Sequence, residues 1–86
     1  MAKVPLVKRN KPKEILTLVQ HETRIRMLKA KLDKYHAFDI SEAILMMDED
    51  ERQRLYENIK LEKLALVFEQ LDEEKAALFI QEMPKS

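Results

Sequence analysis

The chain has 86 residues, enough for one small domain with a single hydrophobic core. It contains no Cys, which excludes disulfides and thiol metal ligands, and no Gly, which excludes Gly-rich phosphate-binding loops. No apolar run approaches the roughly 20 residues that a membrane span requires, so we expect a soluble chain. The net charge is zero, but residues 1–35 hold ten Lys/Arg and three Asp/Glu, whereas residues 36–86 hold six and thirteen. A basic N-terminal third therefore precedes an acidic remainder.

Residues 1–11 are predicted to form a basic flexible tail. A helix is expected to begin at Pro12, because proline fits the first helical turn, where its missing N–H is not needed. Its apolar seam follows helical spacing through Leu18, His21, Ile25, Leu28, Leu32 and Tyr35. This seam predicts one long helix over residues 12–34, which covers the open end of the helices that follow.

A twelve-residue pattern occurs four times, at residues 36–47, 48–59, 60–71 and 72–83. When the units are aligned, the fifth column is Ile40, Arg52, Leu64 and Ala76, the eighth Ala43, Leu55, Val67 and Phe79, the ninth Ile44, Tyr56, Phe68 and Ile80, and the last Met47, Ile59, Leu71 and Met83. Offsets of 3, 4 and 7 between these columns place them on one face of a helix. Each unit is therefore predicted to be one short amphipathic helix followed by a tight turn.

The repeat predicts an all-α fold, a superhelical stack of helix hairpins built from 12-residue helix-turn units and capped by the longer N-terminal helix. Asp48 and Asp72 are good N-caps, whereas Lys60 is a poor one. We assign residues 12–86 to this domain and expect it to be the truncated N-terminal domain of a larger protein. The last unit has no following unit to cover it, so part of its apolar face, Phe79, Ile80 and Met83, is expected to be exposed.

Few side chains in this sequence are candidates for catalysis or metal binding. His21 is expected to be a partly buried residue of the seam, and His36 to hydrogen-bond a backbone group at a helix start. The acidic run Asp48–Glu51 and the pair Asp39 and Glu42 could offer oxygen ligands to a cation, but capping and the helix dipole account for the run. We predict no catalytic residue, no cofactor-binding residue and no identifiable metal ligand, and hence no enzyme.

The basic N-terminal third could bind nucleic acid, but only Tyr35 among its residues could stack on a base, and no DNA-reading motif is present. We therefore expect no nucleic-acid partner. Salt-sensitive binding to any duplex would be the signature of that alternative. Residues 3–13 could also attract anionic lipids, but only modestly, because their charges lie in a loose tail.

Residues 36–44, HAFDISEAI, resemble the first repeat of the cytosolic N-terminal domain of MgtE-type magnesium transporters, which is typically written His-Pro-x-Asp-Ile/Leu-Ala. Here Ala37 replaces the proline and Ser41 the alanine. The junction Leu71–Glu74 also resembles the family pattern, so that the resemblance covers roughly residues 15–84. It implies a regulatory domain at the cytoplasmic face of the cell membrane, placed before CBS domains and a membrane pore in a homodimer.

The resemblance further implies that Mg²⁺ bound between acidic faces of the cytosolic domains holds the gate shut, and that carboxylate repulsion separates the domains when Mg²⁺ falls. Leu66 stands where the family can carry a sensor acid, and other sensor acids are expected beyond residue 86. We therefore expect weak or absent Mg²⁺ binding by this chain alone. The alternative is a helical-repeat protein-interaction module, such as a flagellar-switch-like or adaptor domain.

Overall fold

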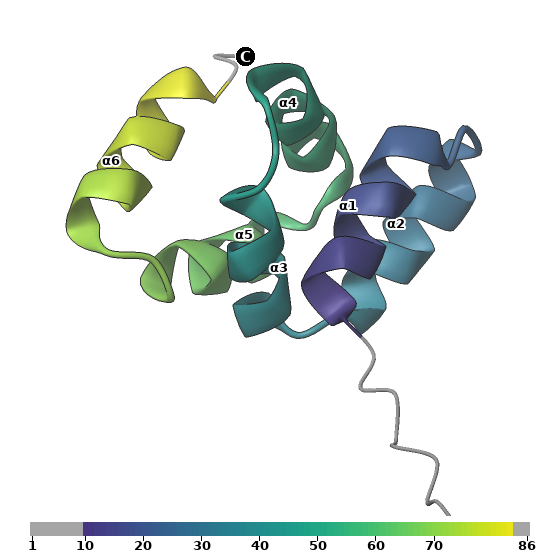
Figure 1. Cartoon of the computed structure of the whole chain (residues 1–86), viewed down its shortest axis with the longest axis horizontal. Helices are drawn as coiled ribbons and strands as arrows, with labels where there is room; N and C mark the ends of the chain where they lie inside the picture. Colours follow the sequence, from purple (N-terminus) through teal and green to yellow (C-terminus); the bar gives the residue numbers. More distant parts are fainter. Residues whose placement is uncertain (1–9, 84–86) are drawn as a thin grey trace, which may run out of the picture.

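The computed structural model describes residues 10–83, all of which lie in α-helices or in connections between them (Figure 1). The helices are α1 (Lys11–His21), α2 (Ile25–Lys34), α3 (Ala37–Ile44), α4 (Glu49–Asn58), α5 (Leu61–Glu69) and α6 (Glu73–Glu82). No strand occurs among residues 10–83, so the all-α prediction is confirmed. The predicted tail falls almost entirely on residues 1–9, outside the described residues, and Lys11 already belongs to α1.

Each twelve-residue unit contains one helix, in the order α3, α4, α5 and α6, as the repeat predicted. The eighth column is buried in every unit, at Ala43, Leu55, Val67 and Phe79. The turns follow the expected capping chemistry. Asp48 accepts a hydrogen bond from the backbone N–H of Glu51, and Asp72 accepts one from that of Lys75, both at 2.8 Å. Lys60 precedes α5 without a side-chain cap, as its residue type suggested.

The N-terminal segment forms two helices, and the prediction of one helix over residues 12–34 is wrong. Between α1 and α2 the backbone is extended at Glu22 (φ −75°, ψ 112°) and Arg24 (φ −85°, ψ 109°). Arg54 of α4 donates to the carbonyl oxygens of Val19 and Glu22, at 2.6 and 2.5 Å. Because Arg54 satisfies carbonyls that the end of α1 leaves without helical partners, a contact distant in sequence stabilises the break.

The break also changes which side chains face the core. Ile15 and Val19 of α1 are buried, together with Leu28 and Leu32 of α2. His21 is exposed at the end of α1, so the prediction of a partly buried His21 is wrong. The continuous seam would have buried this position only if α1 had continued into α2.

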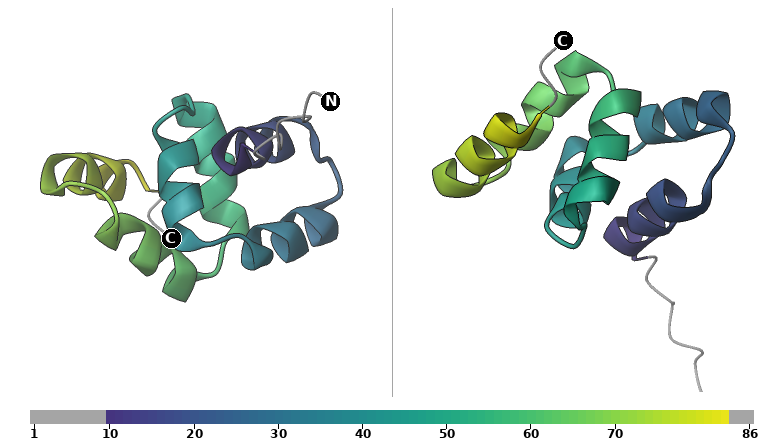
Figure 2. Two further views of the ribbon diagram at one scale, coloured as in Figure 1. Left: turned by 60° about the horizontal axis from the view of Figure 1, so that its bottom comes forward. Right: turned by 90° about the horizontal axis from the view of Figure 1, so that it is seen from above.

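The principal helix contacts skip one helix along the chain: α1 packs on α3, α3 on α5, and α2 on α4. Helix α1 also contacts α4, so the N-terminal helices cover one end of the repeats. Figures 1 and 2 place α1 and α2 at one end of the molecule and α6 at the other, with α3 between them. The pairs α3–α4 and α5–α6 are not among the principal contacts, so the predicted stack of hairpins is not confirmed.

One continuous core extends from α1 to α6, and α3 lies at its centre. Ile40, Ala43 and Ile44 of α3 are fully buried. Phe79 contributes the single α6 side chain of this core within the described residues. Helix α6 therefore makes fewer core contacts with the rest of the domain than the other helices do.

Candidate functional site

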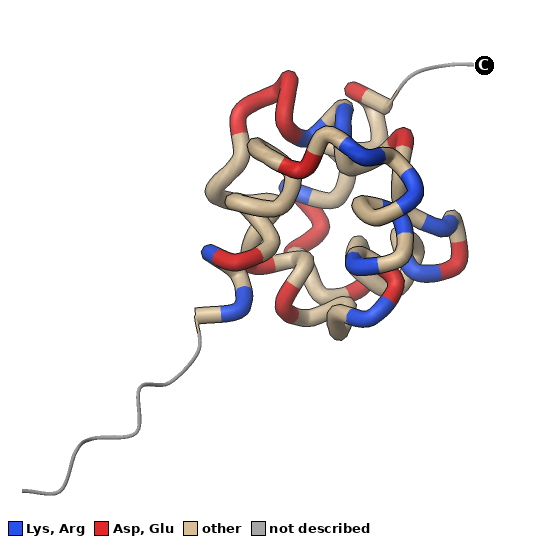
Figure 3. The backbone as a smooth tube through the Cα atoms, turned by 90° about the vertical axis from the view of Figure 1, so that its right-hand side faces the viewer, with Lys and Arg blue, Asp and Glu red and all other residues tan. Residues whose placement is uncertain are grey.

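The acidic run at the start of α4 is used in capping. The backbone N–H of Asp48 donates to Glu51 Oε1 at 2.9 Å, and the backbone N–H of Glu51 donates to Asp48 Oδ1. These two hydrogen bonds form a capping box. Glu51 Oε2 accepts from Gln20 Nε2 of α1 at 2.7 Å. Figure 3 shows this run as the longest continuous acidic stretch of the described backbone. The carboxylates of Asp48 and Glu51 are thus engaged in hydrogen bonds. Glu49 and Asp50 lie in the first turn, where their charges complement the helix dipole.

No carboxylate cluster in the described part of the chain forms a ready metal site. Among residues 10–83, no group of three or more His, Cys, Asp or Glu side chains is arranged to hold a metal ion. At the start of α6, Asp72 is occupied as the N-cap, and Glu73 and Glu74 are exposed in the first turn. These acids can attract cations by their charge, but three or more oxygens do not converge on one point.

The histidines stand apart from each other and from the acidic surfaces. His21 ends α1, and His36 precedes α3 without making the capping hydrogen bond that the sequence suggested. His36 lines a basic hollow at the N-terminal end of the domain. The structure therefore does not bring the two histidines together.

A polar cluster joins α4 to α6. The Glu82 carboxylate accepts hydrogen bonds from the guanidinium of Arg52, with 3.0 Å between Nη2 and Oε1, and from the hydroxyl of Tyr56 at 2.6 Å. Gln53 Nε2 donates to the Glu82 carbonyl oxygen at 2.7 Å. The Arg52 guanidinium also lies 4.9 Å from the centre of the Phe79 ring, within range of a cation–π interaction. We call these five residues the α4–α6 junction.

The junction fixes the ionisation of its members. Hydrogen bonding to Arg52 holds the pKa of the Glu82 carboxyl below its usual range, against an opposing effect of burial. Burial raises the pKa of the Tyr56 hydroxyl, and the neighbouring Glu82 charge raises it further. At neutral pH, Glu82 is therefore an anion and Tyr56 a hydrogen-bond donor, and Arg52 compensates the partly buried charge. This arrangement orients α6 on α4 and offers no nucleophile.

Sequence reasoning missed the junction, although one signal was present. Arg52 occupies the fifth column of the repeat, where the other units have Ile40, Leu64 and Ala76. An arginine in an apolar column indicates a charge that needs a partner at the edge of the core. Its partner, Glu82, is 30 residues away, and no local pattern connects the two.

Exposed apolar side chains also occur on α5 and α6. Leu66 of α5 is 49 % exposed, and Leu78 and Ile80 of α6 are 54 % and 53 % exposed. The sequence predicted exposure of the last unit. Ile80 confirms it, Met83 is half-buried, and Phe79, at 4 % exposure, does not follow it because Arg52 and the core cover the ring. We refer to Leu66, Leu78 and Ile80 as the outer apolar residues.

Short helices in repeating units, a capping acidic run and exposed apolar side chains define a small all-helical domain. The comparison with protein families gives this class a specific identity: residues 35–86 match the family described as MgtE intracellular N domain. Because this match covers more than half of the chain, the protein belongs to that family, the N-terminal domain of MgtE-type magnesium transporters. No curated protein and no solved structure matches the chain. No helix within residues 10–83 is long and apolar enough to cross a membrane.

Proposed function

We propose that this domain is a regulatory element at the cytoplasmic face of a magnesium transporter, where it contributes to Mg²⁺-dependent gating by docking against neighbouring domains of the same protein. The observation that carries the proposal is the family match over residues 35–86, the whole repeat region. The partners that we propose are CBS-type and pore domains, and a second copy of the transporter in a homodimer.

Charge supplies the proposed sensitivity to Mg²⁺. Residues 36–86 carry thirteen Asp/Glu against six Lys/Arg, a formal excess of seven negative charges. When two such surfaces approach each other, their repulsion opposes docking, and a divalent cation between them reduces it. We propose that Mg²⁺ acts between domains in this way. This role requires no complete metal site within the domain, and it agrees with the weak binding that we predict for the isolated chain.

The packing pattern suggests how the domain continues. Helix α1 packs on α3 and α3 on α5, and we propose that the next helix of this series would pack on α5, where Leu66 is exposed. A further helix that packs on α5 in the same way would extend the series into a superhelix. Leu66 occupies the position that the resemblance assigned to a sensor acid. We therefore propose that the outer apolar residues are covered by later helical or CBS-type units, and that the sensor acids belong to those units.

Solution scattering on the complete cytosolic portion of the transporter tests this docking. We expect added Mg²⁺ to reduce the radius of gyration as the domains close. The double variant L66Q/L78Q should lose this compaction, whereas I25Q/M27Q, which changes two exposed apolar residues of α2, should keep it. If the radius of gyration of the wild type is the same without Mg²⁺ and at about 20 mM Mg²⁺, the proposal is contradicted.

The alternative function is a helical-repeat interaction module of the flagellar-switch or adaptor kind. The exposed apolar residues of α5 and α6 could be covered by a protein partner as well as by a domain of the same chain. The reading frame that follows residue 86 separates the two functions. CBS-type units followed by apolar spans support the transporter, and further soluble helical repeats support the alternative.

A further inference from the structure

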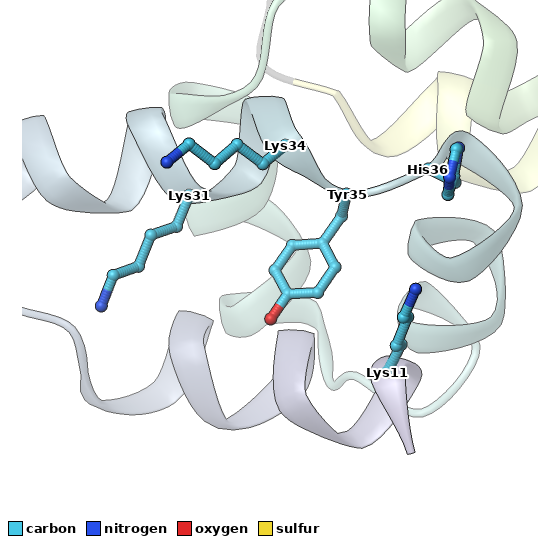
Figure 4. A pocket seen from close by; sticks show the side chains of 5 residues that line it. All are labelled: Lys11, Lys31, Lys34, Tyr35 and His36. Atoms are coloured by element: carbon cyan, nitrogen blue, oxygen red, sulfur yellow. The ribbon is translucent and has the colours of Figure 1, made fainter. Parts of the chain in front are cut away.

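A basic hollow of about 310 Å³ lies where the start of α1, the end of α2 and the α2–α3 connection meet. Its lining residues are Lys11, Lys31, Lys34, Tyr35 and His36. Every one of these side chains can donate a hydrogen bond, and none is acidic. Figure 4 shows Lys11 and His36 on one side of the Tyr35 ring and Lys31 and Lys34 on the other.

The lysines of the hollow are largely uncommitted to other contacts in the described structure. Lys31 Nζ lies 3.5 Å from Glu22 Oε1, and its side chain is 46 % exposed, so that this pair is a weak surface ion pair. Among residues 10–83, no carboxylate lies within 4 Å of the ammonium group of Lys11 or Lys34.

The usual structural role of lysines at a helix end is taken by another residue. Lys31 and Lys34 are in the last turn of α2, where cations ordinarily complement the carbonyl end of the helix. Here Lys63 of α5 performs that role, because its Nζ binds the carbonyl oxygens of Asp33 at 2.8 Å and Tyr35 at 2.7 Å. Lys31 and Lys34 are therefore not required to cap α2.

Two further features favour an anionic ligand in the hollow. Tyr35 is held in place between the lysines, since its hydroxyl donates to Glu14 Oε1 at 3.0 Å. Helix α3 begins next to His36 without a side-chain cap, so its first N–H groups add positive potential beside the hollow. The Glu14 carboxylate lines the adjoining hollow, where its charge opposes anion binding, and it is not among the residues that line this one.

We propose that this hollow binds an anion that carries more than one phosphate group, with lysines engaging phosphates on both sides of Tyr35. Lysine suits this role because a compact ammonium binds phosphate as a point charge. The chemistry is shared by soluble polyphosphates and by the phosphorylated headgroups of membrane lipids. The site shares no residue with the acidic runs or the outer apolar residues of α4 to α6, and it does not depend on the proposed gating function.

Calorimetric titration of the full 86-residue chain with sodium pyrophosphate at low salt tests the site. We expect saturable binding, about tenfold weaker in K11Q/K34Q. The control K29Q/K75Q removes the same charge from α2 and α6, outside the hollow, and should bind like wild type. All substituted positions lie on the surface or at its edge, and thermal melts verify folding. Absence of binding in wild type, or equal weakening in both variants, would overturn the proposal.

Vesicle sedimentation identifies the source of the phosphate. Phosphatidylcholine vesicles with and without a phosphorylated phosphatidylinositol are compared for the same three proteins, which all retain the basic residues 1–9. Binding that K11Q/K34Q loses and pyrophosphate displaces assigns a lipid headgroup. Pyrophosphate binding without vesicle binding assigns a soluble anion. Vesicle binding that all three proteins share, without pyrophosphate binding, overturns the site.

Discussion

The Glu82 carboxylate is a largely buried anion at the end of α6. Arg52 and Tyr56, one turn apart on α4, both bind it, and the partly buried charge is compensated by the guanidinium. A single anion near the end of α6 therefore orients that helix. Removal of one partner would leave the others with unmet hydrogen bonds, which costs more than the net worth of the pair.

We expect Glu82→Gln to lower the free energy of unfolding by about 1–3 kcal/mol at pH 7, measured by urea denaturation. Because the folded-state pKa of Glu82 is lowered, its contribution is present above its ordinary pKa of 4.5 and is lost as the pH falls through the lowered value. The difference between wild type and variant should therefore shrink in acid. Glu57→Gln, an exposed change on α4, should show a much smaller effect. A difference that stays constant with pH would contradict this assignment.

A second prediction concerns Arg54, which donates hydrogen bonds to backbone carbonyl oxygens at the end of α1. Replacement by Gln removes two charge-assisted hydrogen bonds, to Val19 and Glu22, and should cost about 2 kcal/mol in chemical denaturation. Amides near the α1–α2 break should also exchange faster with solvent. Arg26→Gln, at an exposed position of α2, serves as the matched control. Equal stability of the two variants would show that Arg54 does not hold the break.

Among the helices, those fixed by contacts within one repeat unit could be predicted from the sequence, and features fixed by contacts distant in sequence could not. The four helices α3 to α6 could be predicted, because the spacing of the repeat and the caps Asp48 and Asp72 lie within each unit. The α1–α2 break and the α4–α6 junction could not, because Arg54 and Arg52 act on partners about 30 residues away. The exposed end of the last unit followed from the repeat, and the burial of Phe79 did not, because it depends on Arg52.

The helices should differ in local stability. Helix α3 packs on α1 and α5 around fully buried Ile40 and Ile44, whereas α6 depends on Phe79 and the Glu82 cluster. We expect the backbone amides of α6 to exchange at least about tenfold faster than those of α3, as measured by hydrogen exchange with mass spectrometry or NMR. Equal protection of the two helices would mean that α6 unfolds only with the whole domain.

For the whole molecule, charge is divided along the chain between a basic N-terminal third and acidic repeats. Because the carboxylates of residues 10–83 form no converging group, we expect the isolated chain to bind Mg²⁺ with a dissociation constant weaker than about 1 mM in calorimetry. Raised ionic strength should weaken this binding further. A tight site with one Mg²⁺ per chain would instead make one of the acidic runs a true ligand group.

The central proposal is that this domain, a member of the MgtE intracellular N family, restrains transport when Mg²⁺ is plentiful. The most direct measurement is Mg²⁺ flux through the complete transporter in proteoliposomes, at low and high Mg²⁺ on the cytoplasmic side. Wild type and the control I25Q/M27Q should close at high Mg²⁺, whereas L66Q/L78Q, or deletion of residues 35–86, should leave flux high. Full closure of both altered transporters at high Mg²⁺ would contradict the claim.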